Sequence, residues 1–134
     1  MTDKALMSLA VQAREKSYSP YSGFKVGAAL LCRSGKVYLG CNIENAAYTP
    51  TNCAERTAVF KAVSEGEKDF VAIAIVGGKG EEIADFCAPC GVCRQVLAEF
   101  CDKDFRLVLG KPDNIKVFTF EEILPLSFGK SDLE

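Results

Sequence analysis

Three cysteines and one glutamate, placed in two short segments, are the residues of this chain best suited to chemistry. Cys53 and Glu55 stand in the first segment, and Cys90 and Cys93 stand in the second. Three thiolates can hold a zinc ion and leave its fourth position open for water, which is what a catalytic zinc site requires. The carboxylate of Glu55 would then be placed to move protons rather than to bind the metal. The combination indicates metal-assisted hydrolysis.

Both segments are expected to begin helices, at Cys53 and at Pro89-Cys90. The backbone N–H groups at a helix start are unpaired and the macrodipole is positive there, so a thiolate is stabilised. A lowered thiol pKa is what a metal ligand needs. Cys90 and Cys93 are three residues apart, so they share one helix face and can bind the same ion.

The chain contains no histidine, which narrows the possible chemistry further. Catalytic schemes built on Ser-His-Asp or Cys-His arrangements are excluded, and so is any imidazole proton shuttle. A metal must be held by Cys, Asp or Glu. Acid–base work must fall to a carboxylate, Lys, Tyr or Cys, and Glu55 is the carboxylate beside the candidate ligands.

Other uses of these cysteines stay open from spacing alone. A redox dithiol has the same Cys-x-x-Cys spacing, but it does not need the third thiol of Cys53. An iron–sulfur run through Cys87 would need another cysteine where Leu97 stands, and Pro89 places Cys87 in the preceding loop. A zinc ion that only stabilises the fold would not need Glu55 beside an open coordination position.

Length and composition limit the classes of protein. We expect one domain over residues 1–134, with 49% hydrophobic residues to form a core. The net charge of -2 gives no reason to expect nucleic-acid binding. The apolar stretches are shorter than the roughly 20 residues of a membrane span. With no secretion signal in view, a reducing cytoplasmic location is expected, and Cys32, Cys41 and Cys101 are expected to pack as small apolar residues.

Periodicity and turn residues predict the elements that must position these groups. Helices are expected at residues 5–16, 53–64, 89–100 and 121–124. Strands are expected at 25–33, 36–41, 70–76, 105–109 and 115–118. This order predicts an α/β fold, a three-layer α/β/α sandwich with helices covering a mixed five-stranded sheet.

Cys53-Ala54-Glu55 with Pro89-Cys90-Gly91-x-Cys93 resembles the zinc-dependent cytidine deaminase family, in its small three-cysteine, homotetrameric form. The similarity spans nearly the whole chain, through residues 18–22, 40–48 and 124–128. The resemblance implies a cytidine deaminase-like fold and one Zn²⁺ per subunit. It also implies hydrolytic deamination of cytidine and deoxycytidine to uridine and deoxyuridine with release of ammonia, a step of pyrimidine salvage.

The resemblance further implies a role for each site residue. Zinc on the three cysteines would activate a water for attack on C4 of cytosine, and Glu55 would shuttle the protons. Arg56 would offset the thiolate charge, and Gln95 would donate a hydrogen bond behind the ligands. The residues implied to bind substrate are Phe24 against the base, Asn42 and Glu44 at the ribose, and Asn45, Ala46, Tyr48, Ala54 and Phe128 around them.

Partners and alternative substrates follow from the same resemblance. A nucleoside is the implied ligand, with no nucleic-acid or membrane partner, and the tetramer would let Tyr48 and Phe128 reach a neighbour's active site. An unusual nucleoside antibiotic is an alternative substrate, although Asn42-x-Glu44 favours a plain ribose or deoxyribose. Polynucleotide editing is less favoured, because the chain has no basic surface signature.

Overall fold

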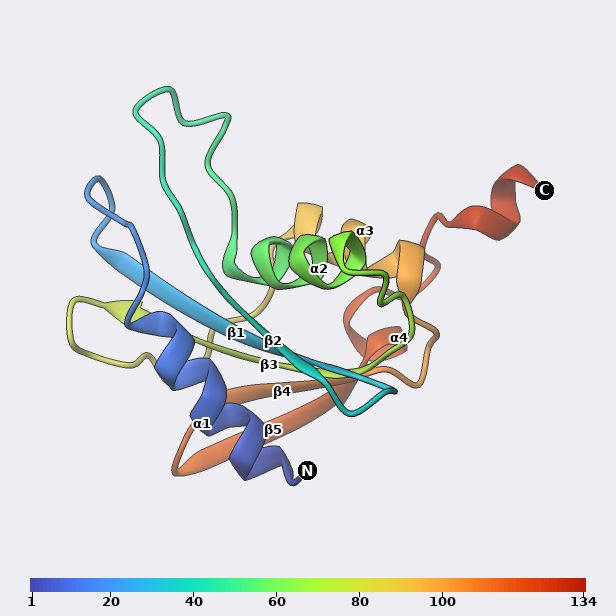
Figure 1. The fold of residues 1–134 in the computed structure, drawn as a ribbon, viewed down its shortest axis with the longest axis horizontal. Helices are drawn as coiled ribbons and strands as arrows, with labels where there is room; N and C mark the ends of the chain where they lie inside the picture. The colour runs from blue at the N-terminus through green and yellow to red at the C-terminus, as the bar shows by residue number, and fades with distance from the viewer.

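The computed structural model describes all of residues 1–134 and shows a five-stranded sheet with helices on both faces (Figure 1). The strands are β1 (Phe24–Cys32), β2 (Val37–Cys41), β3 (Phe70–Lys79), β4 (Arg106–Lys111) and β5 (Asn114–Thr119). The helices are α1 (Asp3–Arg14), α2 (Ala54–Ser64), α3 (Gly91–Phe100), α4 (Phe120–Ile123) and a 3₁₀ turn, η1 (Lys130–Leu133). The predicted order of helices and strands is confirmed. None of these helices has the length and apolar character needed to cross a membrane.

The sheet is mixed, as the sequence predicts, with strand order β2-β1-β3-β4-β5. Strands β3 and β4 run parallel, and the other neighbouring pairs run antiparallel. Parallel neighbours need a crossover connection, and here the connection contains α3. The start of α3, which carries two of the candidate ligands, is therefore placed by the β3–β4 pair.

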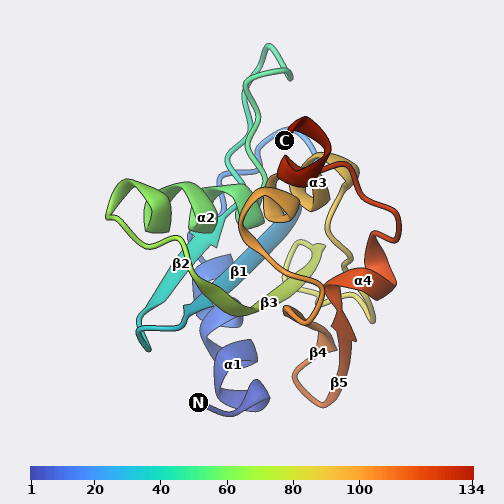
Figure 2. The ribbon, with the colours of Figure 1, turned by 90° about the vertical axis from the view of Figure 1, so that its right-hand side faces the viewer.

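Two apolar layers hold the helices to the sheet. On one face α1 packs through Leu6, Met7 and Ala10 against alternate residues of β1 and β3 such as Ala29 and Ala74. On the other face α2 and α3 pack against the residues of opposite parity in the same strands. Figure 2 shows α1 separated from α2 and α3 by the sheet. Side chains of a strand alternate between the two faces of a sheet, so each face packs against its own helices. The predicted three-layer sandwich is confirmed.

Glycines in β1 and β2 let the helices come unusually close to the strands. A Cβ at Gly27 would lie 2.1 Å from the carbonyl oxygen of Ala10 in α1. A Cβ at Gly40 would lie 2.3 Å from the carbonyl oxygen of Ala54 in α2. The position of α2, and with it of the residues at its start, depends on the missing side chain at Gly40.

Two segments extend away from the sheet (Figures 1 and 2). The loop between β2 and α2 projects beyond the body, and an isolated bridge between Ile43 and Asn52 closes its base. Its tip carries Tyr48, which is 71% exposed. The segment after α4 carries Leu126 and Phe128, which are 104% and 58% exposed, on the way to η1.

The remaining cysteines only partly follow the expectation of burial. Cys32 is 1% exposed in the core below α2, whereas Cys41 and Cys101 are half-buried. All seven cysteines are free thiols. No disulfide therefore contributes to the stability of the fold.

Candidate metal centre and active site

The three predicted ligands meet where α2 and α3 begin. Cys53 is the N-cap of α2 and Cys90 is the N-cap of α3, with Cys93 in the first turn of α3. Their sulfur atoms all lie within 4.8 Å of one another, and the Sγ atoms of Cys53 and Cys90 are 3.7 Å apart. Cys87 is not part of this cluster.

This cluster fits a zinc ion. Tetrahedral thiolates at the usual Zn–S distance of about 2.3 Å stand about 3.8 Å apart, close to the observed separation of Cys53 and Cys90. Three sulfurs also leave one tetrahedral position free. With Cys87 outside the cluster, this position is not closed by a fourth thiol, so the donor set suits catalysis better than a purely structural ion.

Hydrogen bonding favours the thiolate at Cys53, while the hydrogen bond to Cys53 and burial raise the pKa of the Cys93 thiol above the usual value. The pKa of Cys53 is lowered to about 5, first by a hydrogen bond from the Cys93 thiol and then by Arg56. The Nη2 atom of Arg56 donates to Cys53 Sγ at 3.2 Å. Burial opposes the charge on Arg56, yet its bonds to the two sulfurs raise its pKa above the usual value. Arg56 therefore adds a fixed positive charge next to the ligands, as the resemblance implies.

Glu55 is buried beside the cluster, at 4% exposure. It stands two positions after Cys53, a spacing that would point the two side chains apart within a helix. Cys53 is instead extended, with φ -77° and ψ 157°, so both side chains can reach the same cavity. Burial, and after it the negative charge of Cys53, raises the pKa of Glu55 to about 7. A carboxyl group with this pKa can both accept and deliver a proton near neutral pH.

A cavity of about 220 Å³ opens onto Glu55, Cys53 and Cys90. Phe24 at the start of β1, Asn42 after β2 and Ala54 in α2 also line it, as the resemblance implies for substrate-binding residues. A larger hollow of about 410 Å³ lies between α1, β2 and α2. It contains no carboxylate and no member of the cysteine cluster, so the smaller cavity is the candidate active site.

Asn42 has a role in the fold that the sequence does not reveal. Its Nδ2 donates to the carbonyl of Phe24 at 2.8 Å, and its Oδ1 accepts from the amide of Val26 at 2.9 Å. The hydroxyl of Ser17 also donates to this Oδ1, at 2.5 Å. Asn42 thus fixes the start of β1, and one Nδ2 hydrogen remains free for another partner.

Several predicted substrate-binding residues do not line this cavity within one chain. The carboxylate of Glu44 accepts hydrogen bonds from the amides of Tyr21 and Ser22 at 2.9 and 3.1 Å, and another from the Ser22 hydroxyl. This lowers the pKa of Glu44 and keeps its carboxylate in the neighbouring turn. The other predicted residues that stay outside the cavity are Asn45, Ala46, Tyr48 and Phe128.

Gln95 has a different partner from the one the sequence predicts. Its Nε2 donates to the carbonyl of Phe128 at 2.9 Å, so it holds the segment after α4 rather than a zinc ligand. The direction in which the side chain leaves α3 explains this contact. Gln95 is exposed on α3, whereas Cys93 faces inward at 0% exposure, so the two side chains leave the helix in different directions.

Five cavity residues were not predicted: Val26, Thr51, Asn52, Cys87 and Ala88. Burial raises the pKa of the Cys87 thiol to about 12, so this side chain is a neutral wall. Cys87 and Ala88 immediately precede Pro89-Cys90, and this proximity in sequence is a signal that could have found them. Val26 carries no such signal, because its place depends on how β1 meets α2.

Comparisons with known proteins agree with this geometry. The family model described as "Cytidine and deoxycytidylate deaminase zinc-binding region" matches residues 1–109. A protein named cytidine deaminase from Halalkalibacterium halodurans is 50% identical over 134 residues, which cover 99% of this chain and 98% of that protein. Another, from Sporosarcina psychrophila, is 48% identical over 99% of this chain and 96% of its own length.

A solved structure gives the same result. The crystal structure of cytidine deaminase from Burkholderia pseudomallei superposes with a TM-score of 0.87 at 47% identity, covering 96% of this chain and 100% of that one. Its similarity extends over the whole sandwich and is not confined to the cysteine segments. The chain belongs to the cytidine and deoxycytidylate deaminase family, and Cys53, Cys90 and Cys93 form its zinc-binding triad.

Proposed function

We propose that this chain catalyses the hydrolytic deamination of cytidine and deoxycytidine to uridine and deoxyuridine, releasing ammonia. The observation that carries the proposal is the burial of Glu55 in a small cavity beside the three-cysteine cluster. The names of the relatives support the same activity.

Zinc would be held by Cys53, Cys90 and Cys93, one ion per subunit. When bound, it supplies a Lewis acid that makes a water molecule acidic enough to attack at neutral pH. Glu55 would accept a proton from this water and deliver it to ring N3 as the C4–O bond forms. It would then move the proton of the new C4 hydroxyl to the amino group, which leaves as ammonia when the C4–N bond breaks. Its pKa of about 7 suits both directions of transfer. Arg56 limits the negative charge that three thiolates place at the site.

The cavity walls bind the base and the sugar. Phe24 offers an aromatic face to the pyrimidine, and the neutral Cys87 thiol offers an apolar contact. The free Nδ2 hydrogen of Asn42 would donate to a ribose hydroxyl. Glu44 would accept a hydrogen bond from a second hydroxyl, because its bonds to the adjacent turn do not use all the acceptor positions of the carboxylate.

We further propose a homotetramer in which neighbouring subunits complete the active site. Tyr48, Leu126 and Phe128 are large apolar side chains that project far into solvent in a single chain. Exposed apolar groups gathered on projecting segments are typical of interaction surfaces. The single-chain cavity also lacks Tyr48 and Phe128, which a neighbour would supply. A cytoplasmic location suits seven free thiols, since a reducing compartment keeps them reduced.

The fall in ultraviolet absorbance on incubation with cytidine, deoxycytidine and cytosine tests the activity directly. Glu55→Gln keeps the size of the side chain but cannot shuttle a proton, so kcat should fall by about 10²–10⁴. Glu99→Gln, an exposed position on α3, is the matched control and should behave like the wild type. Zinc content is measured for both variants. Wild-type turnover by zinc-loaded Glu55→Gln would overturn the assignment of Glu55.

A further inference from the structure

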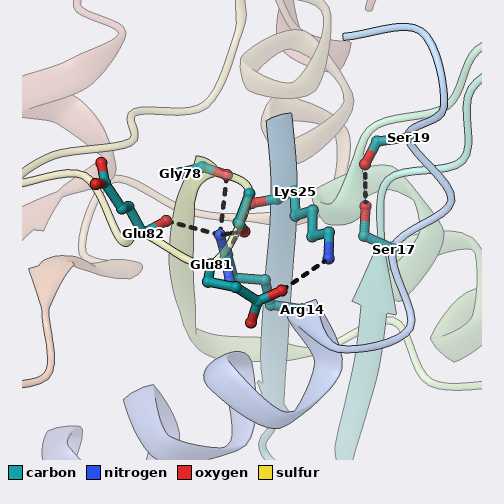
Figure 3. Close-up of polar contacts among 8 residues, drawn as sticks. Arg14, Ser17, Ser19, Lys25, Gly78, Glu81 and Glu82 are labelled. Atoms are coloured by element: carbon teal, nitrogen blue, oxygen red, sulfur yellow. Dashed lines mark hydrogen bonds and ion pairs between the residues drawn. The ribbon is translucent and has the colours of Figure 1, made fainter. Parts of the chain in front are cut away.

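Arg14, at the end of α1, is a buried cation without a carboxylate partner (Figure 3). It is only 4% exposed. Its guanidinium binds backbone carbonyls instead. Nε donates to Lys25 at 3.0 Å, and the two hydrogens of Nη2 are shared among the carbonyls of Gly78, Gly80 and Glu82, at 2.9, 2.7 and 2.7 Å. Burying a charge is unfavourable unless the charged group is hydrogen-bonded. The converging carbonyls supply these hydrogen bonds to Arg14.

The carbonyls belong to β1, to the end of β3 and to the loop that directly follows β3. Lys25 is the second residue of β1, and Gly78 lies near the end of β3. Gly80 and Glu82 belong to the loop that leads toward Cys87. The backbone of this loop passes close to β3, because a Cβ at Gly78 would lie 2.0 Å from the carbonyl oxygen of Glu82. A planar guanidinium with a fixed fork of donors can hold all three segments in one geometry.

These carbonyls lie next in sequence or in space to two residues of one cavity wall, Phe24 and Cys87. At Gly77, one residue before a carbonyl held by Arg14, a Cβ would lie 2.7 Å from Cys87 Sγ and 3.1 Å from Cε1 of Phe24. Phe24 and Cys87 therefore meet over the bare backbone of β3, and both line the cavity. A shift of the loop relative to β1 would separate these two side chains.

The far end of the loop is fixed independently. The Nε of Arg94 donates to the carbonyl of Pro89 at 2.8 Å, directly before the ligand Cys90. The exposed ion pair between Lys25 and Glu81, at 3.5 Å, is weak by comparison. Backbone hydrogen bonds from Gly80 to Gly23 and from Ala84 to Gly77 also hold the near end of the loop. Arg14 is the buried side chain that joins this end of the loop to β1.

We propose that Arg14 is a positioning residue for substrate binding, which acts by holding Phe24 and Cys87 together as the wall that contacts the base. The inference rests on the proposed deamination, since it assigns this wall to the pyrimidine. Arg14 touches neither the base nor the zinc ligands. Its effect on the reaction is therefore expected in binding rather than in the chemical step.

The test is the steady-state kinetics of Arg14→Lys with cytidine. Lysine keeps the charge but offers a compact ammonium group that cannot span the same carbonyls. KM should rise about tenfold while kcat per zinc-loaded subunit stays within about threefold, because the wall contacts substrate and transition state alike. A role in folding alone would lower the yield or the melting temperature and leave KM unchanged, and that result would overturn the proposal.

Arg106→Lys is the matched control. Arg106 binds Asp3 at the opposite end of α1, at 2.5 Å, and does not line the cavity. Its KM and kcat should stay at wild-type values. The wild-type activity separates the two hypotheses: inactivity of the wild type would overturn the deamination, whereas an unchanged KM in Arg14→Lys overturns only the role of Arg14.

A second measurement needs only the wild-type protein. Residues 80–84 do not line the cavity, yet Arg14 couples them to the wall. Binding of uridine, the reaction product, should therefore slow amide hydrogen exchange in residues 80–84 as well as at Cys87. Exchange in 80–84 that is the same with and without saturating uridine would overturn the proposed coupling, whether or not Arg14→Lys folds.

Discussion

Replacing Gly40 with alanine should displace the helix that carries Glu55 and thereby slow catalysis. The new Cβ would lie 2.3 Å from the carbonyl oxygen of Ala54 and 2.6 Å from the amide nitrogen of Ala58. Ordinary contacts of a Cβ begin near 3.4 Å, so α2 must move from β2 by about 1 Å. Both clashing atoms belong to the helix backbone, which cannot move aside as a flexible side chain would.

The displacement has two expected effects of calculable size. Ala54 lies between Cys53 and Glu55, so both groups should shift relative to Cys90. A misplacement of about 1 Å in an active site can lower the rate about 10²-fold. Overpacking of this kind also lowers the free energy of unfolding by about 1–3 kcal/mol.

The assay combines kcat for cytidine, zinc content and urea unfolding. Gly91→Ala is the control: it stands next to the ligand Cys90, but a Cβ there would meet nothing within 4 Å. It should keep wild-type kcat and stability. If Gly40→Ala also kept both, the contact between α2 and β2 would not determine the position of Glu55, and the reasoning would be refuted.

Three further perturbations test other parts of the site. Arg56→Ala removes the hydrogen bond to Cys53 and should lower kcat about tenfold or more, given the usual strength of charged hydrogen bonds; an unchanged kcat at equal zinc content would contradict the charge-balance role. Asn42→Ala removes hydrogen bonds to Phe24, Val26 and Ser17. It should lower the free energy of unfolding by roughly 2–3 kcal/mol and raise KM. An unchanged urea midpoint would show that these bonds do not fix the start of β1. Removing zinc with a chelator should abolish deamination and lower the melting temperature, and added zinc should restore both; activity that persists in verified metal-free protein would exclude a catalytic metal.

Local sequence signals were sufficient to predict most of the fold. Helical periodicity, turn residues and strand-like runs depend on neighbouring residues, so the order of elements and the start of α2 and α3 were predictable. Strand β3 shows the limit. It continues through Gly77 and Gly78 to Lys79, beyond the predicted end at residue 76. These glycines are typical of a loop, but pairing with Phe24–Val26 in β1 keeps them in the sheet.

The site shows the same division between local and distant causes. The three ligands and Glu55 were predictable, because their residue types and spacing carry the chemistry. The role of Arg14 was not predictable. An arginine in the last turn of an amphipathic helix is usually an exposed charge that interacts favourably with the helix dipole. Its burial depends on a loop more than 60 residues away. Glu44, Tyr48 and the other residues outside the cavity were predicted from the resemblance alone.

The division of the zinc ligands between two helix starts has a consequence for how the protein is made. Cys90 and Cys93 are close in sequence, so even an unfolded chain can present both to an ion. Cys53 is 37 residues from Cys90, and it reaches them only after β3, the strand between the two helices, has paired in the sheet. A newly synthesised chain therefore binds zinc in two stages, weakly through the local pair and tightly once the sheet has formed. In a cell where free zinc is scarce, folded copies would take the metal from unfolded ones.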